Sequence, residues 1–177
     1  MSQEASPKDR TAPVRQGEEI EVAKLRPFLA EALGEAEEIS VAQFPGGHSN
    51  LTYLVTVDGR ELVLRRPPFG SKVKRAHDMK REHTVLSALS AHKPWAPKPV
   101  AFCDDPAVMG ADFYLMERID GIIVRRGVPK GIEITPAIAR RMCERLFDVM
   151  IDLHATDYRA IGLGELGRPE GYVERQV

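Results

Sequence analysis

The chain has 177 residues, of which 43% are hydrophobic, with a formal net charge of −1 and two cysteines. Its longest apolar runs fall short of the ~18 residues that a membrane-spanning helix needs, and two cysteines cannot build a disulfide framework or a zinc site. The sequence therefore predicts a soluble cytoplasmic protein, with one domain or one domain and part of a second.

The first elements of the chain are predicted from apolar spacing and turn residues. Residues 1–17 show no apolar period and are expected to form a disordered leader. A helix follows, with an apolar face that ends at Gly34, and then a strand from Glu38 to Phe44. Pro45, Gly46 and Gly47 break this strand, so a glycine-rich turn is expected after it.

A β-hairpin is the clearest local feature of the sequence. Apolar and polar residues alternate from Leu51 to Val57, and Asp58-Gly59 separates that run from a second one, Arg60–Arg66. An Asp-Gly pair between two alternating runs is a strong signal for a two-residue hairpin turn. The chain is thus expected to open with a three-stranded antiparallel meander.

Further along the chain, a helix is predicted from about Ala76 to Ser90, followed by two short strands over 100–103 and 113–118. The loop between these strands, 104–110, carries turn residues. Thr135 precedes Pro136, the combination typical of an N-cap and first helical residue. The helix that begins there is expected to extend to about His154 with a continuous apolar stripe.

The turn after the first strand contains residues suited to phosphate binding. Two glycines allow positive φ angles and let backbone N–H groups come close to a ligand, and short polar side chains follow them. The candidate residues are Gly46, Gly47, His48, Ser49 and Asn50. Alone, however, such a turn is more often only a hairpin connection.

Arg65 and Glu82 form a second candidate pair. Glu82 lies within the apolar stripe of its helix, where a carboxylate is costly to bury unless a cation meets it. Arg65, at the end of the third strand, would be that cation; alternatively, Glu82 lies at the edge of the stripe and reaches water. Periodicity leaves both readings open. The first would match the layout in which kinases hold nucleotide phosphates.

Five segments, in order, resemble the aminoglycoside phosphotransferase family, in particular the branch related to the kinase-like domain of certain acyl-CoA dehydrogenases. They cover 46–53 (GGHSNLTY), 62–68 (LVLRRPP), 81–83 (REH), 114–121 (YLMERIDG) and 153–157 (LHATD). Each segment is short, but the five occur in order, and the resemblance as a whole covers the chain from about Leu25 to its last residue.

This resemblance implies an α+β, protein-kinase-like fold: an N-terminal lobe with a five-stranded antiparallel sheet plus helix, followed by the first helix of a C-terminal lobe. ATP would be the cofactor, beneath a phosphate-covering loop at Gly46–Asn50. Arg65 would stand where many relatives have a strand lysine, with Glu82 as its partner. The adenine would meet the backbone of a hinge formed by Met116, Glu117, Arg118 and Ile119.

The resemblance also predicts the domains and their limits. Residues 18–121 would form the ATP-binding lobe, and 122–177 a linker and the beginning of a truncated helical lobe. The family's catalytic Asp lies in a His-Gly-Asp loop, which this sequence lacks. No catalytic residue or Mg²⁺ ligand is therefore assigned, although Mg²⁺ is expected in a complete enzyme. By itself this chain should be inactive toward a small hydroxylated substrate.

Two other functions stay open. The chain could be a non-catalytic, pseudokinase-like interaction module. Less favoured is a nucleic-acid-binding module, because the stretch Arg60–Arg81 carries eight bases against two acids but only one aromatic residue, Phe69. The apolar stripe of the helix over 135–154 further predicts self-association, and no membrane partner is expected.

Overall fold

The computed structural model describes residues 10–45, 49–70, 77–124, 127–128, 131–167 and 170–176. The chain divides into two compact units. Arg10–Ile119 form the first unit, which ends close to the predicted limit of the ATP-binding lobe, and Asp120–Val177 make up most of the second.

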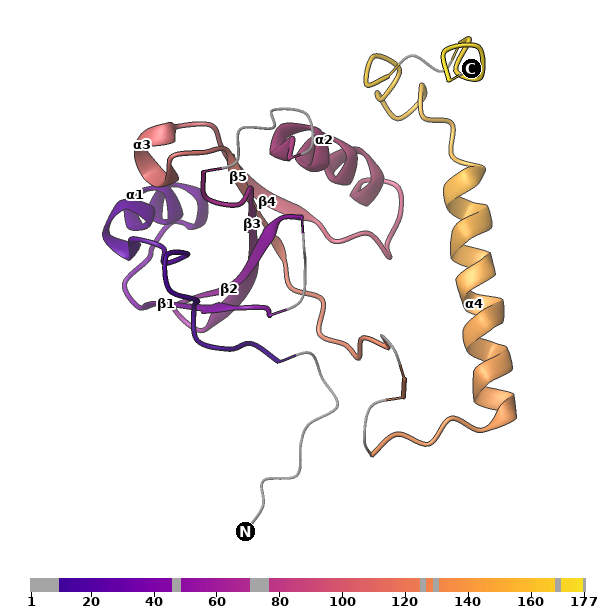
Figure 1. Ribbon diagram of the computed structural model, residues 1–177, viewed down its shortest axis with the longest axis horizontal. Coiled ribbons are helices and arrows are strands. Elements are labelled where there is room, and N and C mark those ends of the chain that lie inside the picture. Colours follow the sequence, from indigo (N-terminus) through magenta and orange to yellow (C-terminus); the bar gives the residue numbers. More distant parts are fainter. Residues whose placement is uncertain are drawn as a thin grey trace. The chain divides into compact units, whose positions relative to one another are not determined.

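The first unit is built on a five-stranded antiparallel sheet, as predicted (Figure 1). Its strands lie in the order β1-β2-β3-β5-β4. They are β1 (Ile39–Gln43), β2 (Leu51–Val57), β3 (Arg60–Arg66), β4 (Pro99–Cys103) and β5 (Phe113–Glu117). The bounds of β2 and β3 are those that the alternation of apolar residues predicts.

The turn between β2 and β3 has the geometry that its sequence favours. Asp58 and Gly59 have φ angles of 48° and 82°. Two central residues with positive φ are typical of the type I′ turn, whose twist matches that of the flanking strands. The Asp58 carboxylate also accepts hydrogen bonds from the backbone N–H groups of Glu37, at 3.2 Å, and Glu38, at 2.7 Å. The turn therefore also holds the start of β1.

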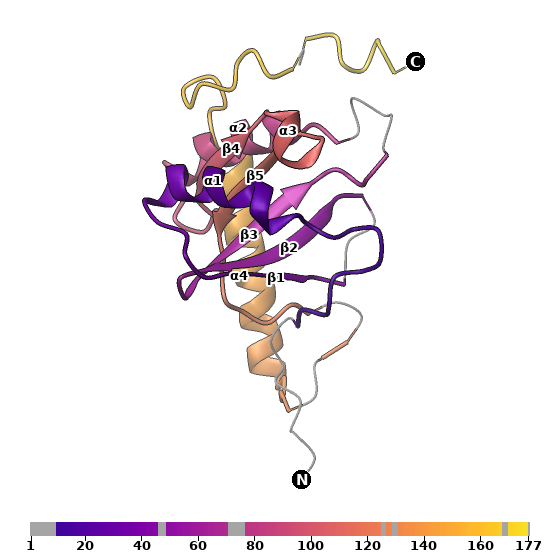
Figure 2. The same ribbon diagram turned by 90° about the vertical axis from the view of Figure 1, so that its left-hand side faces the viewer.

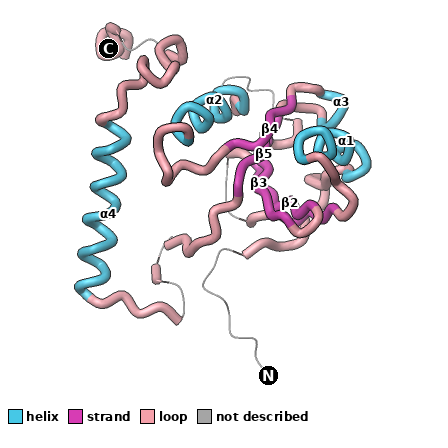
Figure 3. Tube along the Cα trace, turned by 180° about the vertical axis from the view of Figure 1, so that it is seen from behind, coloured by secondary structure: helices cyan, strands magenta, loops and turns pink. Residues whose placement is uncertain are grey.

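Helices cover both faces of the sheet. Helix α1 (Val22–Leu33) packs against the short helix α3 (Pro106–Met109), and α2 (Met79–Ser90) packs against β4 and β5. Seen from behind, the strands lie between α2 and the α1–α3 pair (Figure 3). Asp78 is the N-cap of α2 and accepts a hydrogen bond from the Arg81 N–H at 2.8 Å.

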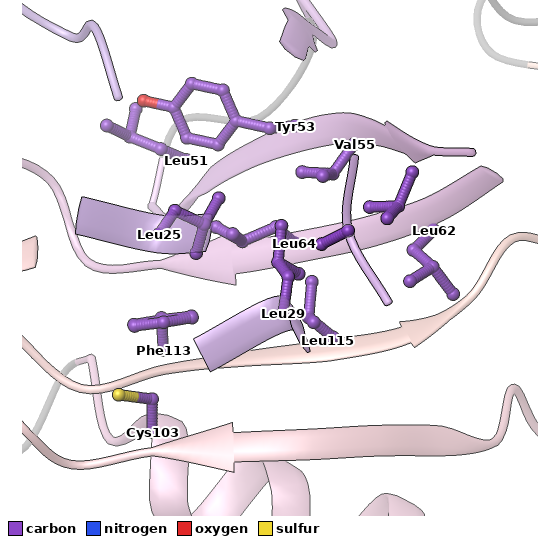
Figure 4. Close-up of a cluster of buried hydrophobic side chains, with 12 residues drawn as sticks. Leu25, Leu29, Leu51, Tyr53, Val55, Leu62, Leu64, Cys103, Phe113 and Leu115 are labelled. Carbon is purple, nitrogen blue, oxygen red and sulfur yellow. The ribbon is translucent and has the colours of Figure 1, made fainter. Parts of the chain in front are cut away.

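The main hydrophobic core lies between α1 and the sheet. Leu25 and Leu29 of α1 are fully buried against alternate residues of the central strands (Figure 4). The strand residues of this cluster are Leu51, Tyr53, Val55, Val57, Leu62, Leu64, Cys103, Phe113 and Leu115. Because side chains alternate along a strand, the intervening residues face α2.

Residues 10–17 make specific contacts, although their composition had placed them in a disordered leader. Ala12 and Gln43 exchange backbone hydrogen bonds of 2.8 and 2.9 Å. The buried Gln43 side chain accepts the Arg15 N–H at 3.0 Å and donates to Glu18 at 2.6 Å. Composition alone did not predict this pairing with β1. Residues 1–9 lie outside the described residues.

The second unit contains helix α4 (Pro136–His154), one continuous helix in Figures 1 and 2. The Thr135 hydroxyl accepts a hydrogen bond from the Ile138 N–H at 3.3 Å, which confirms the predicted N-cap. No residue of α4 is buried. Among the described residues, no helix is both long and apolar enough to span a membrane.

The alternation of core-facing and α2-facing side chains along β2 and β3 predicts which substitutions in the sheet destabilise the protein most. Leu64→Ala removes a fully buried side chain from the α1 core and should lower the free energy of unfolding by about 2–5 kcal/mol. Leu54→Ala, on the α2 face of β2 and only half-buried, should cost clearly less. Urea unfolding followed by circular dichroism would measure both. Equal losses would contradict this assignment of faces.

Candidate functional site

The α2 face of the sheet carries two neighbouring rows of side chains. In one row, Thr52 is paired with Arg65, and Arg65 with Tyr114. In the next row, cross-strand pairing aligns four apolar residues, which are Ala42, Leu54, Val63 and Met116. A polar row thus runs directly alongside an apolar one.

Arg65 meets Glu82 of α2 in an ion pair, as the first of the two sequence readings predicted. Its Nε donates to Glu82 Oε2 at 3.0 Å, and its Nη2 donates to Oε1 at 3.4 Å. The two side chains are 28% and 33% exposed, so the pair is only partly shielded from water. Arg65 Nη1 also donates to the Thr52 hydroxyl at 3.4 Å.

Two further donors hold the Glu82 carboxylate. Asn50 Nδ2 donates to Oε1 at 2.8 Å, and the Tyr114 hydroxyl donates to Oε2 at 3.0 Å. Asn50 Oδ1 in turn lies 2.7 Å from His77 Nδ1. Because every donor comes from a different element, Glu82 joins α2 to β3, to β5 and to the residue that precedes β2.

The local electrostatics keep these groups in fixed protonation states. Burial by itself would lower the pKa of Arg65, but the hydrogen bond and negative charge of Glu82 outweigh it and raise the pKa. Burial, followed by the charge of Glu82, raises the pKa of Tyr114 well above its ordinary value of 10.0. Tyr114 is therefore a neutral hydroxyl donor, and Arg65 a permanent cation, at physiological pH.

A hollow of about 430 Å³ adjoins the ion pair. Arg65, Glu82 and Tyr114 line its polar side, and Val85, Leu86, Pro97 and Met116 supply apolar walls. Arg81 also lines it. Its size falls in the ~300–1,000 Å³ range of small-molecule sites, which are mostly apolar with a few polar groups that fix the ligand.

The predicted phosphate-covering loop is only partly described. Gly46, Gly47 and His48 lie outside the described residues. Ser49 is exposed, whereas Asn50 is 8% exposed with its amide bonded to Glu82. In this arrangement the Asn50 side chain positions the Glu82 carboxylate and is not free to bind a phosphate.

The four predicted hinge residues follow or end β5. Met116 lines the hollow, and the Glu117 N–H donates to the Lys98 carbonyl at 2.8 Å. Arg118 forms an ion pair with Glu61 on β3. Ile119 is 63% exposed. The structure therefore places Met116 beside the Arg65–Glu82 pair, while the Arg118 side chain is engaged with the hairpin.

Sequence reasoning missed Tyr114 and the role of Asn50. Both contact Glu82 across more than 30 residues of sequence, so no local pattern could reveal them. The register of β3 with β5 is the signal that was needed, because it sets Tyr114 directly beside Arg65. Among the described residues, no group of three or more His, Cys, Asp or Glu side chains could hold a metal ion.

A five-stranded antiparallel sheet whose strand arginine meets a helix carboxylate, next to an apolar row, is the arrangement of a kinase-like N-terminal lobe. The model of the phosphotransferase enzyme family matches residues 40–177, and the chain belongs to this family. A crystal structure of a Ralstonia eutropha JMP134 protein, assigned as an aminoglycoside phosphotransferase, superposes with a TM-score of 0.72 and 30% identity over 89% of this chain.

Two curated relatives are acyl-CoA dehydrogenase family members. Member 11 from Gallus gallus is 33% identical over 94% of this chain, and member 10 from Mus musculus is 32% identical over 94%. The chain spans 22% and 16% of the length of these relatives, and 45% of the Ralstonia chain. The comparisons confirm the predicted family and its kinase-like fold.

Proposed function

We propose that residues 10–119 bind ATP as part of a phosphotransferase that moves the γ-phosphate to a hydroxyl of a small molecule. The observation that carries this proposal is the Arg65–Glu82 ion pair beside the apolar row. The Arg65 guanidinium would attract the phosphates, and Glu82 would hold it in place. Membership of the phosphotransferase enzyme family supports this reaction class.

The base of the nucleotide would lie against the apolar row. Leu54 and Met116 are half-buried, which leaves part of each side chain available to a flat aromatic ring, and Val63 lies between them. The phosphates would then extend toward Arg65 and the loop that precedes Asn50. Kinase reactions require Mg²⁺ on the phosphate oxygens, and we assign none of the described residues to that ion.

The nucleic-acid alternative receives less support from the structure. Of the bases in the stretch Arg60–Arg81, Arg65 is ion-paired and Arg66 is 3% exposed. Arg60, Lys80 and Arg81 are exposed, so two of the five described bases are withdrawn from the open cationic surface that an electrostatic binder needs.

Titration of the chain with Mg–ATP would test the proposal. Arg65→Met should weaken ATP binding about tenfold or more, since it removes a charge-assisted contact to phosphate. Arg60→Met, on the exposed start of the same strand, should leave the affinity unchanged. Absence of binding at millimolar Mg–ATP would contradict the proposal and favour the non-catalytic interaction module. Equal losses of ATP affinity in the two variants would show that ATP responds to the net charge of the chain and not to Arg65 in particular.

A further inference from the structure

Two consecutive arginines of β3 lie on opposite faces of the sheet. Arg65 faces α2 and pairs with Glu82, whereas Arg66 pairs in register with Leu51, a member of the α1-side core. Strand alternation makes this separation unavoidable. Arg65 has an acidic partner, so its charge is balanced. The position of the Arg66 charge on the core side of the sheet has to be explained by other contacts.

Arg66 is a buried cation that forms no ion pair with any residue in the described part of the chain. It is 3% exposed. Its Nε donates to the Pro67 carbonyl at 3.0 Å, and its Cζ lies 3.5 Å from the centre of the Phe69 ring. Burial lowers the pKa of Arg66, as expected for a charge removed from water without a counterion.

The Nη atoms of Arg66 retain a small accessible surface. In the described residues, no buried side-chain nitrogen or oxygen lacks a hydrogen-bond partner, and the hydrogen bond of Arg66 is made by Nε. The Nη atoms must therefore carry the small accessible surface that the residue retains. Arg66 lines a cavity of about 290 Å³ between the loop before α1, α1 itself and α3, with Lys24 and Phe69 also in its wall.

The two acidic residues of this Arg66 cavity each have a partner, and for Glu21 that partner is Lys24, which also lines the cavity. Glu21 forms an ion pair with Lys24 at 2.9 Å, and Glu19 accepts the Gly17 N–H at 2.7 Å. Phe69 covers the flat face of the guanidinium, so its edge is the part left for a ligand. That edge presents parallel N–H groups, which match the two oxygens of a carboxylate or phosphate.

We propose that the Arg66 cavity is a binding site for a small oxyanion, a carboxylate or phosphate group, held by the Nη edge of Arg66. Its volume lies just below the ~300–1,000 Å³ of ordinary small-molecule sites, which suits a compact anion better than a nucleotide. The site is on the sheet face opposite the Arg65–Glu82 pair, so it does not depend on nucleotide binding there.

Titration of the full chain with inorganic phosphate, and separately with acetate, tests this site. The ¹⁵N NMR resonance of the Arg66 side-chain Nε–H should shift during the titration until the site is saturated. The anion that saturates the shift at the lower concentration is the one that the cavity prefers. Arg66→Met should weaken binding about ten- to one-hundredfold. Arg60→Met, on the exposed start of the same strand, is the matched control and should bind as the unchanged chain does, whereas Arg65→Met tests whether the anion lies at the α2 face instead.

Three results would overturn the proposal. The Arg66 resonance could stay fixed with both anions. The cation–π contact and the Pro67 carbonyl would then suffice to stabilise the buried Arg66 charge without an anion. Arg65→Met could abolish binding, which would place the anion at the α2 face. Arg66→Met could bind as tightly as the unchanged chain. The resonance of the unchanged chain decides the question even if Arg66→Met fails to fold.

Discussion

Glu82→Gln should weaken Mg–ATP binding about tenfold, a loss of ~1.4 kcal/mol. The Glu82 carboxylate receives hydrogen bonds from Arg65, Asn50 and Tyr114, and an amide cannot accept all of them. The pair is partly exposed, so its Coulomb attraction is screened and contributes little by itself. The expected effect comes from releasing Arg65 from the orientation in which it would meet phosphate.

Glu61→Gln is the matched control for this substitution. Glu61 pairs with Arg118 at the other end of β3, on an exposed part of the hairpin, and its loss should change ATP affinity about twofold or less. Isothermal titration calorimetry of the two variants gives the comparison. If both variants lost the same affinity, Glu82 would have no specific role, and the Arg65–Glu82 pair would be only a structural contact.

The sequence predicted best those elements whose signals are local. The bounds of β2 and β3 follow from alternation and the Asp58-Gly59 turn, and α4 begins and ends where Thr135-Pro136 and its apolar stripe predicted. Helix α3 was missed inside a predicted loop. It begins with Asp105 as N-cap and Pro106 at its first position, the same kind of signal that revealed α4.

Elements that depend on distant contacts could be predicted only in part. Helix α2 begins at Met79, after the Asp78 cap, although periodicity had placed its start near Ala76, which lies outside the described residues. The Arg65–Glu82 contact was one of the two readings that periodicity left open, and it was weighed because a carboxylate in an apolar stripe needs a cation. Asn50 and Tyr114 were not foreseen as its partners, since only the three-dimensional register brings them to Glu82.

Helix α4 leaves many of its apolar side chains open to water. Leu146 and Phe147 are 59% and 60% exposed, and a stripe continues along the helix through Ile138, Met142, Val149 and Leu153. Soluble monomers seldom expose contiguous apolar patches beyond a few hundred Å². The stripe would gain stability from any apolar surface that covers it, and a second copy of the chain supplies one.

We therefore expect the purified chain to self-associate through α4. Its sedimentation coefficient should rise with protein concentration, and the double substitution Leu146→Gln/Val149→Gln should shift the distribution toward monomer. Arg145→Gln, next to the stripe on an exposed position of the same helix, should leave the distribution unchanged. A chain that remains monomeric at every concentration, with one sharp thermal transition, would mean that these side chains are covered within the chain. The interpretation of residues 122–177 as the beginning of a larger helical lobe would then be wrong.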